Sequence, residues 1–233
     1  MGLRNNIIRK IYREKDLDRI QMQIDMLGGK SKFDATAFIN LQLLSSLIVF
    51  LVVLYESKHA YIFAPAITLG WYYAYYYLII TKPLKMRIRK LDHEALYFFE
   101  ILTLTLESGR NLENSLEVTV ANVKSELSDE FKRALLEVHF GKSLLEALED
   151  MKKRIPSETV NNIILNITQT NIFGNSILDT MYNQIAFLRD KQILEIKGQI
   201  NKIPNKISII SVLFVVPLIM ILILGPFLLN FLG

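Results

Sequence analysis

The chain has 233 residues, of which 51% are hydrophobic and 21% charged, and its formal net charge is +4. Its mean hydropathy of +0.28 is high for a soluble protein, yet the charge is too abundant for a chain that lies wholly in lipid. The charge is segregated, because residues 36–55, 60–80 and 207–232 contain no Asp, Glu, Lys, Arg or His. These observations exclude a simple soluble enzyme, a disordered tail and a fully embedded transporter. They favour a small membrane protein with a soluble domain.

The first 35 residues are charged throughout and lack the apolar segment of a secretory signal peptide. A helix is predicted over residues 4–27, ending at Gly28-Gly29, so that residues 1–35 form an N-terminal cytoplasmic amphipathic segment. Two interpretations of this helix remain open at this stage. It lies on the membrane or against the helical bundle, or it docks onto a cytoplasmic partner.

Three uncharged segments are predicted to cross the membrane. A span needs ~20 apolar residues to cross ~30 Å of hydrocarbon. The first two spans, 37–55 and 60–80, form a hairpin within residues 36–80, and the third span lies in residues 207–233.

The distribution of Lys and Arg predicts the orientation of these spans. The N-terminal segment carries eight of these residues, the loop 56–59 carries one and the segment 81–206 carries eighteen. We therefore expect a multi-pass protein of the inner (cytoplasmic) membrane, with the N-terminus and residues 81–206 in the cytoplasm and the C-terminus outside. Since its charges nearly balance, the segment 81–206 predicts no nucleic-acid partner. The basic residues after the second span are expected to contact lipid headgroups; they are Lys82, Lys85, Arg87, Arg89 and Lys90.

The segment 81–206 shows helical periodicity and few strand signals. Start and stop signals predict a cytoplasmic bundle of about six helices between the second and third spans. The expected helices cover residues 88–108, 112–123, 129–140, 144–155, 158–173 and 176–203. Asn111, Ser143 and Ser157 are the expected N-caps, and the third helix is expected to follow Ser128. The fold class is therefore all-α.

One turn pattern recurs three times at a spacing of 32 and 33 residues. In each copy a glycine ends a helix in the left-handed conformation, and apolar residues follow three and seven positions later. The pattern predicts three related helix–turn–helix connections. In the three copies, the glycine and the apolar residue three positions after it are Gly109 and Leu112, Gly141 and Leu144, and Gly174 and Ile177.

The sequence offers no recognisable catalytic, cofactor or metal site. It contains no cysteine, and its three histidines do not share a metal-ligand spacing. No phosphate-binding loop, dinucleotide-binding motif or nucleophile elbow is present. We therefore expect a protein that is not an enzyme and uses no cofactor or metal. A transporter or ion-driven stator subunit is the alternative, although its spans would ordinarily carry ionisable residues.

Two features of the spans stand out. Trp71, Tyr72 and Tyr73 would lie near mid-bilayer, where polar groups need hydrogen-bond partners, so we expect an intramembrane protein contact there. Pro217 in the third span, followed by Gly225 and Pro226, predicts a kink that serves packing or acts as a hinge.

The order of spans and turns resembles the type II secretion system F domain family. The resemblance is carried by Glu107-Ser-Gly-Arg-Asn-Leu112, His139-Phe-Gly-Lys-Ser-Leu144 and the Gly174-Asn-Ser-Ile turn. The Arg189–Pro204 stretch before a Pro-containing last span is also similar. The length is most like the single-domain TadC/TadB branch of the tight-adherence pilus systems, whereas general secretory F proteins carry two such domains.

The resemblance implies an integral membrane platform protein of a secretion or type IV-like (Tad) pilus machine. Such a protein would couple a cytoplasmic secretion ATPase to the extraction and assembly of pilin or pseudopilin. It would contact membrane lipids and form an oligomer, with itself or with a second F-domain platform subunit.

Overall fold

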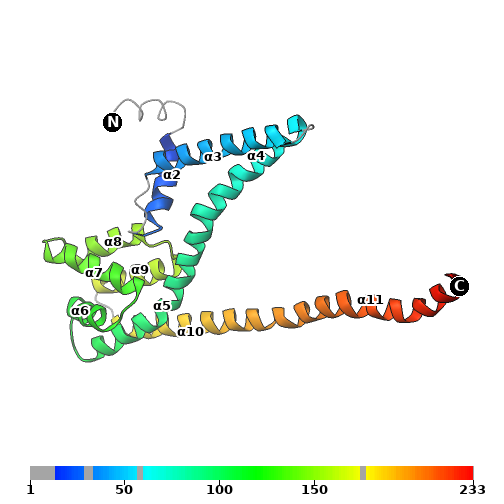
Figure 1. Ribbon diagram of the computed structural model, residues 1–233. Helices are drawn as coiled ribbons and strands as arrows, with labels where there is room; N and C mark the ends of the chain where they lie inside the picture. The colour runs from blue at the N-terminus through cyan, green and yellow to red at the C-terminus, as the bar shows by residue number, and fades with distance from the viewer. Residues whose placement is uncertain (1–13, 29–33, 57–59, 174–176, 233) are drawn as a thin grey trace. The chain divides into compact units, whose positions relative to one another are not determined.

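The described part of the chain is almost entirely α-helical. The computed structural model describes residues 14–28, 34–56, 60–173 and 177–232 (Figure 1). Within these ranges there is no β-strand, which confirms the predicted all-α class. The chain divides into two units, Met1–Tyr182 and Asn183–Gly233, and each is described by itself.

Helices α3 (Ala35–Glu56) and α4 (Ala60–Tyr76) form an antiparallel hairpin in the first unit. Polar side chains join the two apolar helices. Gln42 Nε2 donates a hydrogen bond of 3.0 Å to the Tyr72 carbonyl, and Trp71 Nε1 donates one of 3.4 Å to Ser45 Oγ. A polar group that packs between two apolar helices carries a free-energy penalty if it lacks a hydrogen-bond partner. These two hydrogen bonds remove that penalty.

The structure corrects the prediction of three membrane spans. In the ranges described, two segments rather than three are long and apolar enough to cross a membrane, Ala35–Tyr55 and Ile207–Leu224. Helix α4 has 17 residues, and at Tyr77 the helix changes to a π-helical turn, η1 (Tyr77–Thr81). A π-turn shifts the backbone hydrogen bonds from four to five residues apart. Composition does not record this shift, so the uncharged run 60–80 gave no sign of it.

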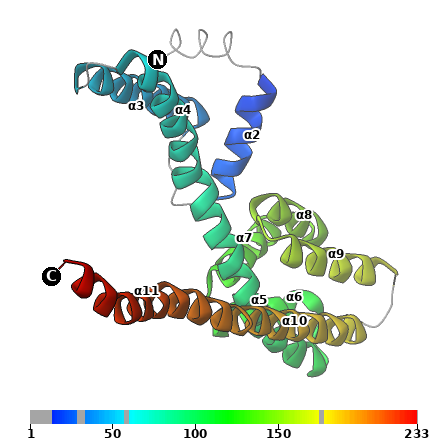
Figure 2. The same ribbon diagram turned by 90° about the vertical axis from the view of Figure 1, so that its right-hand side faces the viewer.

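Helix α5 (Lys82–Glu107) continues directly from η1 and reaches into the helical bundle (Figure 2). It begins six residues before the predicted start at Ile88, because the chain enters it already helical and needs no cap. Pro83 is tolerated since its missing N–H falls in the first turn. One face of α5 is fully buried, including Leu91, Phe98 and Leu102.

Four shorter helices pack with α5 to form the bundle: α6 (Leu112–Asn122), α7 (Glu126–His139), α8 (Leu144–Arg154) and α9 (Glu158–Phe173). Aromatic rings mark its centre. The rings of Phe98 and Phe131 stack with their centroids 4.5 Å apart, and the ring of Phe99 meets Phe131 edge-on at 6.2 Å. Offset and edge-on contacts of this kind add to the energy of burial.

Local hydrogen bonds explain where these helices begin. Asn111 accepts from the Asn114 N–H at 2.8 Å, Ser157 accepts from the Val160 N–H at 3.1 Å, and Ser143 forms a capping box with Glu146. These three predicted caps are confirmed. The prediction that α7 follows Ser128 is wrong, because Ser125 caps the helix by accepting from the Ser128 N–H at 3.0 Å.

Two of the three repeated glycine turns lie in the described residues. Gly109 and Gly141 have φ angles of +80° and +99°, the left-handed conformation that the pattern predicts. Leu112 is buried, whereas Leu144 and Ile177 are half-buried. Gly174 lies outside the described residues.

Helix α2 (Glu14–Asp25) lies against the base of the hairpin. Tyr76 Oη donates to Gln23 Oε1 at 2.5 Å, and the Ala35 N–H at the start of α3 donates to Gln21 Oε1 at 2.9 Å. A small apolar cluster joins α2, α3 and η1; it consists of Leu17, Ile24, Ala35, Phe38, Ile39 and Ile80. Helix α2 therefore packs mainly against the hairpin rather than against the bundle, and docking onto a cytoplasmic partner stays a prediction.

The second unit contains most of α10 (Ile177–Ile200) and all of α11 (Lys202–Leu232). The helical hydrogen bonding continues where these helices meet, since the Asn201 N–H donates to the Lys197 carbonyl at 2.9 Å. Residues 207–224 are almost all apolar and exposed. Helix α11 remains α-helical through Pro217 and through residues 225–226, so the predicted kink or hinge stays a prediction.

Candidate functional site

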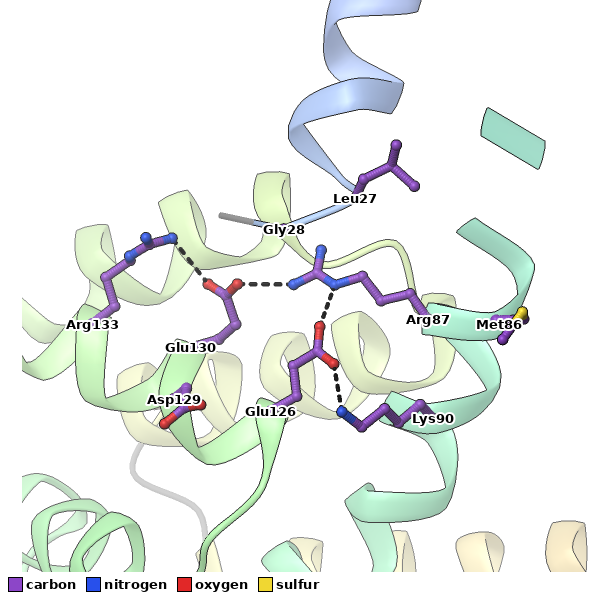
Figure 3. Close-up of a pocket in the computed structure, with 9 residues that line it drawn as sticks. All are labelled: Leu27, Gly28, Met86, Arg87, Lys90, Glu126, Asp129, Glu130 and Arg133. Atoms are coloured by element: carbon purple, nitrogen blue, oxygen red, sulfur yellow. Dashed lines mark hydrogen bonds and ion pairs between the residues drawn. The ribbon is translucent and has the colours of Figure 1, made fainter. Parts of the chain in front are cut away.

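A polar pocket of the first unit lies where the end of α2 meets α5 and the start of α7 (Figure 3). Its volume is about 650 Å³. Side chains of both signs line it, with the cations coming mainly from α5 and the carboxylates from α7. The lining residues are Leu27, Gly28, Met86, Arg87, Lys90, Glu126, Asp129, Glu130 and Arg133.

Arg87 is the centre of this site. Only 6% of the residue is exposed, which is unusual for an arginine. Its guanidinium donates to Glu126 Oε1 at 2.6 Å and to Glu130 Oε1 at 2.9 Å. It also donates to two backbone carbonyls, Met26 at 2.5 Å and Arg154 at 3.0 Å. One side chain of α5 therefore holds α2, α7 and α8 together.

The environment compensates for burying this charge. Glu126 and Glu130 supply two carboxylates, and the planar guanidinium can reach both at once. The two carbonyls come from the last turn or the end of a helix, α2 for Met26 and α8 for Arg154. The carbonyl end of a helix carries partial negative charge and stabilises a cation. Arg87 thus lies between two carboxylates and two helix C-termini, and we call this arrangement the Arg87 joint.

Gly28 makes the close approach of the α2 end possible. Its φ angle is +87°, a conformation that favours glycine. A Cβ atom at this position would lie 3.2 Å from Arg87 Cζ and 3.3 Å from its Nε. The backbone of Gly28 therefore covers the guanidinium at a distance that any side chain would increase.

The Arg87 joint belongs to a longer series of ion pairs that alternates between positive and negative groups. The series connects α5, α7 and α8, with N–O distances between 2.5 and 3.5 Å. Its members, in order, are Lys90, Glu126, Arg87, Glu130, Arg154, Glu137, Lys142, Asp150 and Lys153.

Ionisation of these groups is tuned by their neighbours. Burial alone would raise the pKa of Glu126, but hydrogen bonds and charge from Arg87 and Lys90 outweigh burial and hold that pKa below its usual value. The same partnership raises the pKa of Lys90. At the other end, hydrogen bonds from Lys142 and Lys153 lower the pKa of Asp150 to about 2. Glu126, Lys90 and Asp150 are therefore held in their charged forms by their partners in the series.

The five basic residues expected at lipid headgroups fall into different environments. Lys82, Lys85 and Arg89 are exposed on α5, and the Lys85 Nζ lies 5.9 Å from the centre of the Tyr77 ring. Arg87 instead points inward, so its guanidinium is not available to lipid. Lys90 is exposed but pairs with Glu126 at 2.9 Å. The alternation of inward and outward residues follows from the helical period of 3.6.

Sequence reasoning did not identify the partners of Arg87. Glu126 and Glu130 lie 39 and 43 residues away along the chain, and the Met26 carbonyl lies 61 residues away. The signal that could have found them was the spacing of Glu126 and Glu130, four residues apart on one helix face, in the first and second turns of α7.

Trp71, Tyr72 and Tyr73 lie on α4 in different surroundings. Trp71 contacts Ser45 of α3, and the Tyr72 carbonyl accepts from Gln42 of α3. The Tyr73 side chain is 71% exposed and packs edge-on against the Tyr72 ring at 5.9 Å. Two of the three residues therefore contact the other arm of the hairpin, whereas Tyr73 points away from the described chain.

Among the described residues no group of three or more His, Asp or Glu side chains could hold a metal ion. His139 Nε2 lies 3.2 Å from Glu117 Oε1, and its ring Nδ1 lies 2.9 Å from the Leu135 carbonyl. The Tyr182 hydroxyl donates to Glu107, and the Ser157 hydroxyl donates to Asp92. The contacts of His139 with Glu117, Tyr182 with Glu107 and Ser157 with Asp92 link different helices or their caps, whereas the His139–Leu135 contact lies within α7.

A family model described as "Type II secretion system (T2SS), protein F" matches residues 98–225, more than half of the chain. The chain belongs to this family. No curated protein and no solved structure matches the chain. The match begins inside α5 and ends inside α11. The hairpin, α2 and Arg87 therefore precede the region that defines the T2SS protein F family, whereas Glu126, Glu130 and Arg154 lie within it.

Proposed function

We propose that the protein is a membrane platform subunit of a type II secretion or type IV-like (Tad) pilus machine. In this proposal α3 and α11 hold the chain in the inner membrane. Helix α4 is too short to count as a span by itself, but it continues without a break into η1, and the two together run back along α3 and return the chain to the cytoplasmic side, where α5–α9 form the bundle. Residues 1–35 and 81–206 would then share the cytoplasmic side, with residues 36–80 and 207–233 as the membrane parts.

One observation carries the proposal: the matched region joins a polar helical bundle to an apolar helix whose side chains are exposed. The bundle helices α7 and α8 carry many surface charges, whereas the residues of α11 between 207 and 224 expose apolar side chains. Exposed apolar surface of that extent requires lipid or protein around it. A T2SS protein F domain attached to a lipid-facing helix is the arrangement that a platform subunit needs.

The Arg87 joint suits a part that transmits mechanical load. Within the first unit it connects α2, α5, α7 and α8, and α2 in turn packs on the hairpin through its apolar cluster. A movement imposed on the bundle by a cytoplasmic ATPase would therefore pass to the hairpin through buried contacts. The proposed partners are a secretion ATPase, a pilin or pseudopilin, and a second platform subunit. Lys82, Lys85 and Arg89 would contact lipid headgroups.

The proposal is tested by purifying the tagged full-length chain from membranes of its own cells under mild detergent. We expect a cytoplasmic secretion ATPase to co-purify, with nucleotide hydrolysis arising from that ATPase and absent from the chain alone. The matched control is the Arg89→Met variant, whose change lies on the exposed face of α5 and should leave the amount of co-purified ATPase unchanged. Nucleotide hydrolysis by the isolated chain, or extraction of the chain from membranes by alkaline carbonate, would overturn the proposal.

A further inference from the structure

Six isoleucines follow one another at alternating spacings of three and four residues across the end of α10 and the start of α11. They are Ile193, Ile196, Ile200, Ile203, Ile207 and Ile210. This spacing places one apolar residue at every a and d position of a seven-residue repeat. The positions between them are mostly polar, with Leu194, Pro204 and Ile209 as the apolar exceptions. We call this stripe the isoleucine seam.

The seam follows one face of a nearly unbroken helix. The hydrogen bond from the Asn201 N–H to the Lys197 carbonyl, at 2.9 Å, continues the helical pattern between α10 and α11. Among the seam residues with described side chains, exposure ranges from 48% at Ile193 to 59% at Ile207. Ile193, Ile196 and Ile200 precede the apolar span of α11, and an apolar stripe exposed to water is unfavourable, so a covering partner is expected there.

We propose that the isoleucine seam packs against the same seam of a second copy, with the two helices parallel. Isoleucine at both a and d positions is a pattern by which like helices associate, and it favours bundles of three or four helices over pairs. The seam leads directly into α11, so copies in one membrane would present it in the same direction and at the same depth. This direction rests on the proposed function, since it requires α11 to lie in the membrane.

The charges beside the seam are compatible with parallel packing. In a parallel pair, a g position of one helix faces the following e position of its partner. Gln192 of each copy would then face Lys197 of the other copy, so neither of these two equivalent contacts brings like charges together. Glu195 and Gly198 lie at outer positions, and a Cβ added at Gly198 would meet no atom within 4 Å.

The absence of native cysteine allows a direct test. Single cysteines are placed at seam positions (Ile193→Cys, Ile196→Cys, Ile200→Cys) and at outer positions (Glu195→Cys, Gly198→Cys), and membranes holding each full-length variant are oxidised. We expect a disulfide-linked product of twice 26.9 kDa at the seam positions and several-fold less at the outer ones. Equal cross-linking at all five positions, no cross-linking, or linkage to a different protein would overturn the seam.

A second pair of variants separates packing from general loss of apolar surface. Ile196→Asp places a charge in the seam, whereas Leu194→Asp places the same charge on an exposed apolar residue outside it. We expect the detergent-solubilised Ile196→Asp protein to lose most of its oligomer and Leu194→Asp to keep it, measured by light scattering after gel filtration. Equal loss in both would contradict the seam.

The two proposals fail in distinguishable ways. A chain that stays in carbonate-washed membranes but gives no seam cross-links keeps the platform function and overturns the seam. A chain that is absent from the membrane fraction overturns both.

Discussion

Arg87 lies where water is largely excluded, and its charge is balanced by groups from three other helices. Burying a lone arginine would cost several kcal/mol, and pairing recovers that cost only when nearly every donor has a partner. Here the guanidinium meets two carboxylates and two carbonyls. The residue therefore favours one arrangement of α2, α5, α7 and α8 over others.

Replacing Arg87 by Met should strongly destabilise the first unit. The change removes four hydrogen bonds and leaves Glu130, whose side chain is 8% exposed, without its buried partner. We expect the free energy of unfolding to fall by about 3–5 kcal/mol. Chemical denaturation of the full-length chain in detergent, followed by circular dichroism, measures it. Arg89→Met, on the exposed face two residues away, should change it by less than about 0.5 kcal/mol; equal losses would contradict the joint.

Three glycines test the role of Gly28. Gly28→Ala should lower the thermal midpoint most, for two reasons. It forces alanine into a left-handed backbone conformation, which costs about 1–2 kcal/mol, and it brings a Cβ atom into close contact with Arg87. Gly109→Ala has the same conformation but open space around it, so only the backbone cost applies. Gly198→Ala lies inside α10 in open space and should stabilise the chain by about 1 kcal/mol. If Gly109→Ala lowers the thermal midpoint as much as Gly28→Ala does, the close approach of Gly28 to Arg87 does not contribute to stability.

At the residue scale, the sequence predicted what local rules determine. Asn111, Ser143 and Ser157 act as N-caps, and Gly109 and Gly141 end helices, because these roles involve neighbours within a few residues. Pairing of Arg87 with Glu126 depends on how α5 and α7 meet, which local patterns do not encode. The sequence thus predicted a headgroup contact for Arg87 from its position near the spans, and the fold turned its side chain inward.

At the scale of elements, the ion-pair series connects α5, α7 and α8. The carboxyl pKa of Glu126 in the folded protein lies below its ordinary value of 4.5, and that of Asp150 falls from 3.8 to about 2. A lowered pKa means that the ionised form stabilises the fold above the unfolded-state value. That stabilisation is lost as the pH falls through the folded-state value.

We therefore expect the denaturation midpoint to be nearly constant from pH 7 to pH 5 and to fall between about pH 4.5 and pH 2. Glu126→Gln should lower the midpoint at pH 7 and flatten the upper part of the acid-induced decrease, since the titrating group is gone. Glu113→Gln serves as the control, since this carboxylate lies outside the series. An unchanged pH profile in Glu126→Gln would show that the series does not contribute to acid sensitivity.

Two helix boundaries show where element prediction reached its limit. Ser125 and Ser128 are both good N-cap residues three positions apart, so the sequence supports either start of α7. The structure selects Ser125, and Glu94 of α5 then accepts from the Leu127 N–H at 3.0 Å in the first turn. The π-helical turn η1 was missed for a related reason: its Ile80 packs with α2 and α3, and this tertiary contact is invisible to composition.

At the scale of the molecule, the family region begins at Phe98 and the Arg87 joint spans its boundary. Carboxylates inside the region hold a cation that precedes it, and that cation holds the end of α2. Within the first unit, α2, the hairpin and the bundle are therefore one connected part, and the proposed function places the bundle in the cytoplasm. The distribution of Lys and Arg predicts on which side of the membrane each part lies, because these residues concentrate in the N-terminal segment and in residues 81–206.

The most direct test of this account is the side of the membrane on which the bundle lies. Lys153 at the end of α8 has a side chain that is 76% exposed, and the chain has no native cysteine. Lys153→Cys should be labelled by a membrane-impermeant maleimide only after spheroplasts are opened, whereas Ser57→Cys, between α3 and α4, should be labelled in intact spheroplasts. Labelling of Lys153→Cys in intact spheroplasts would contradict a cytoplasmic bundle and with it the platform function.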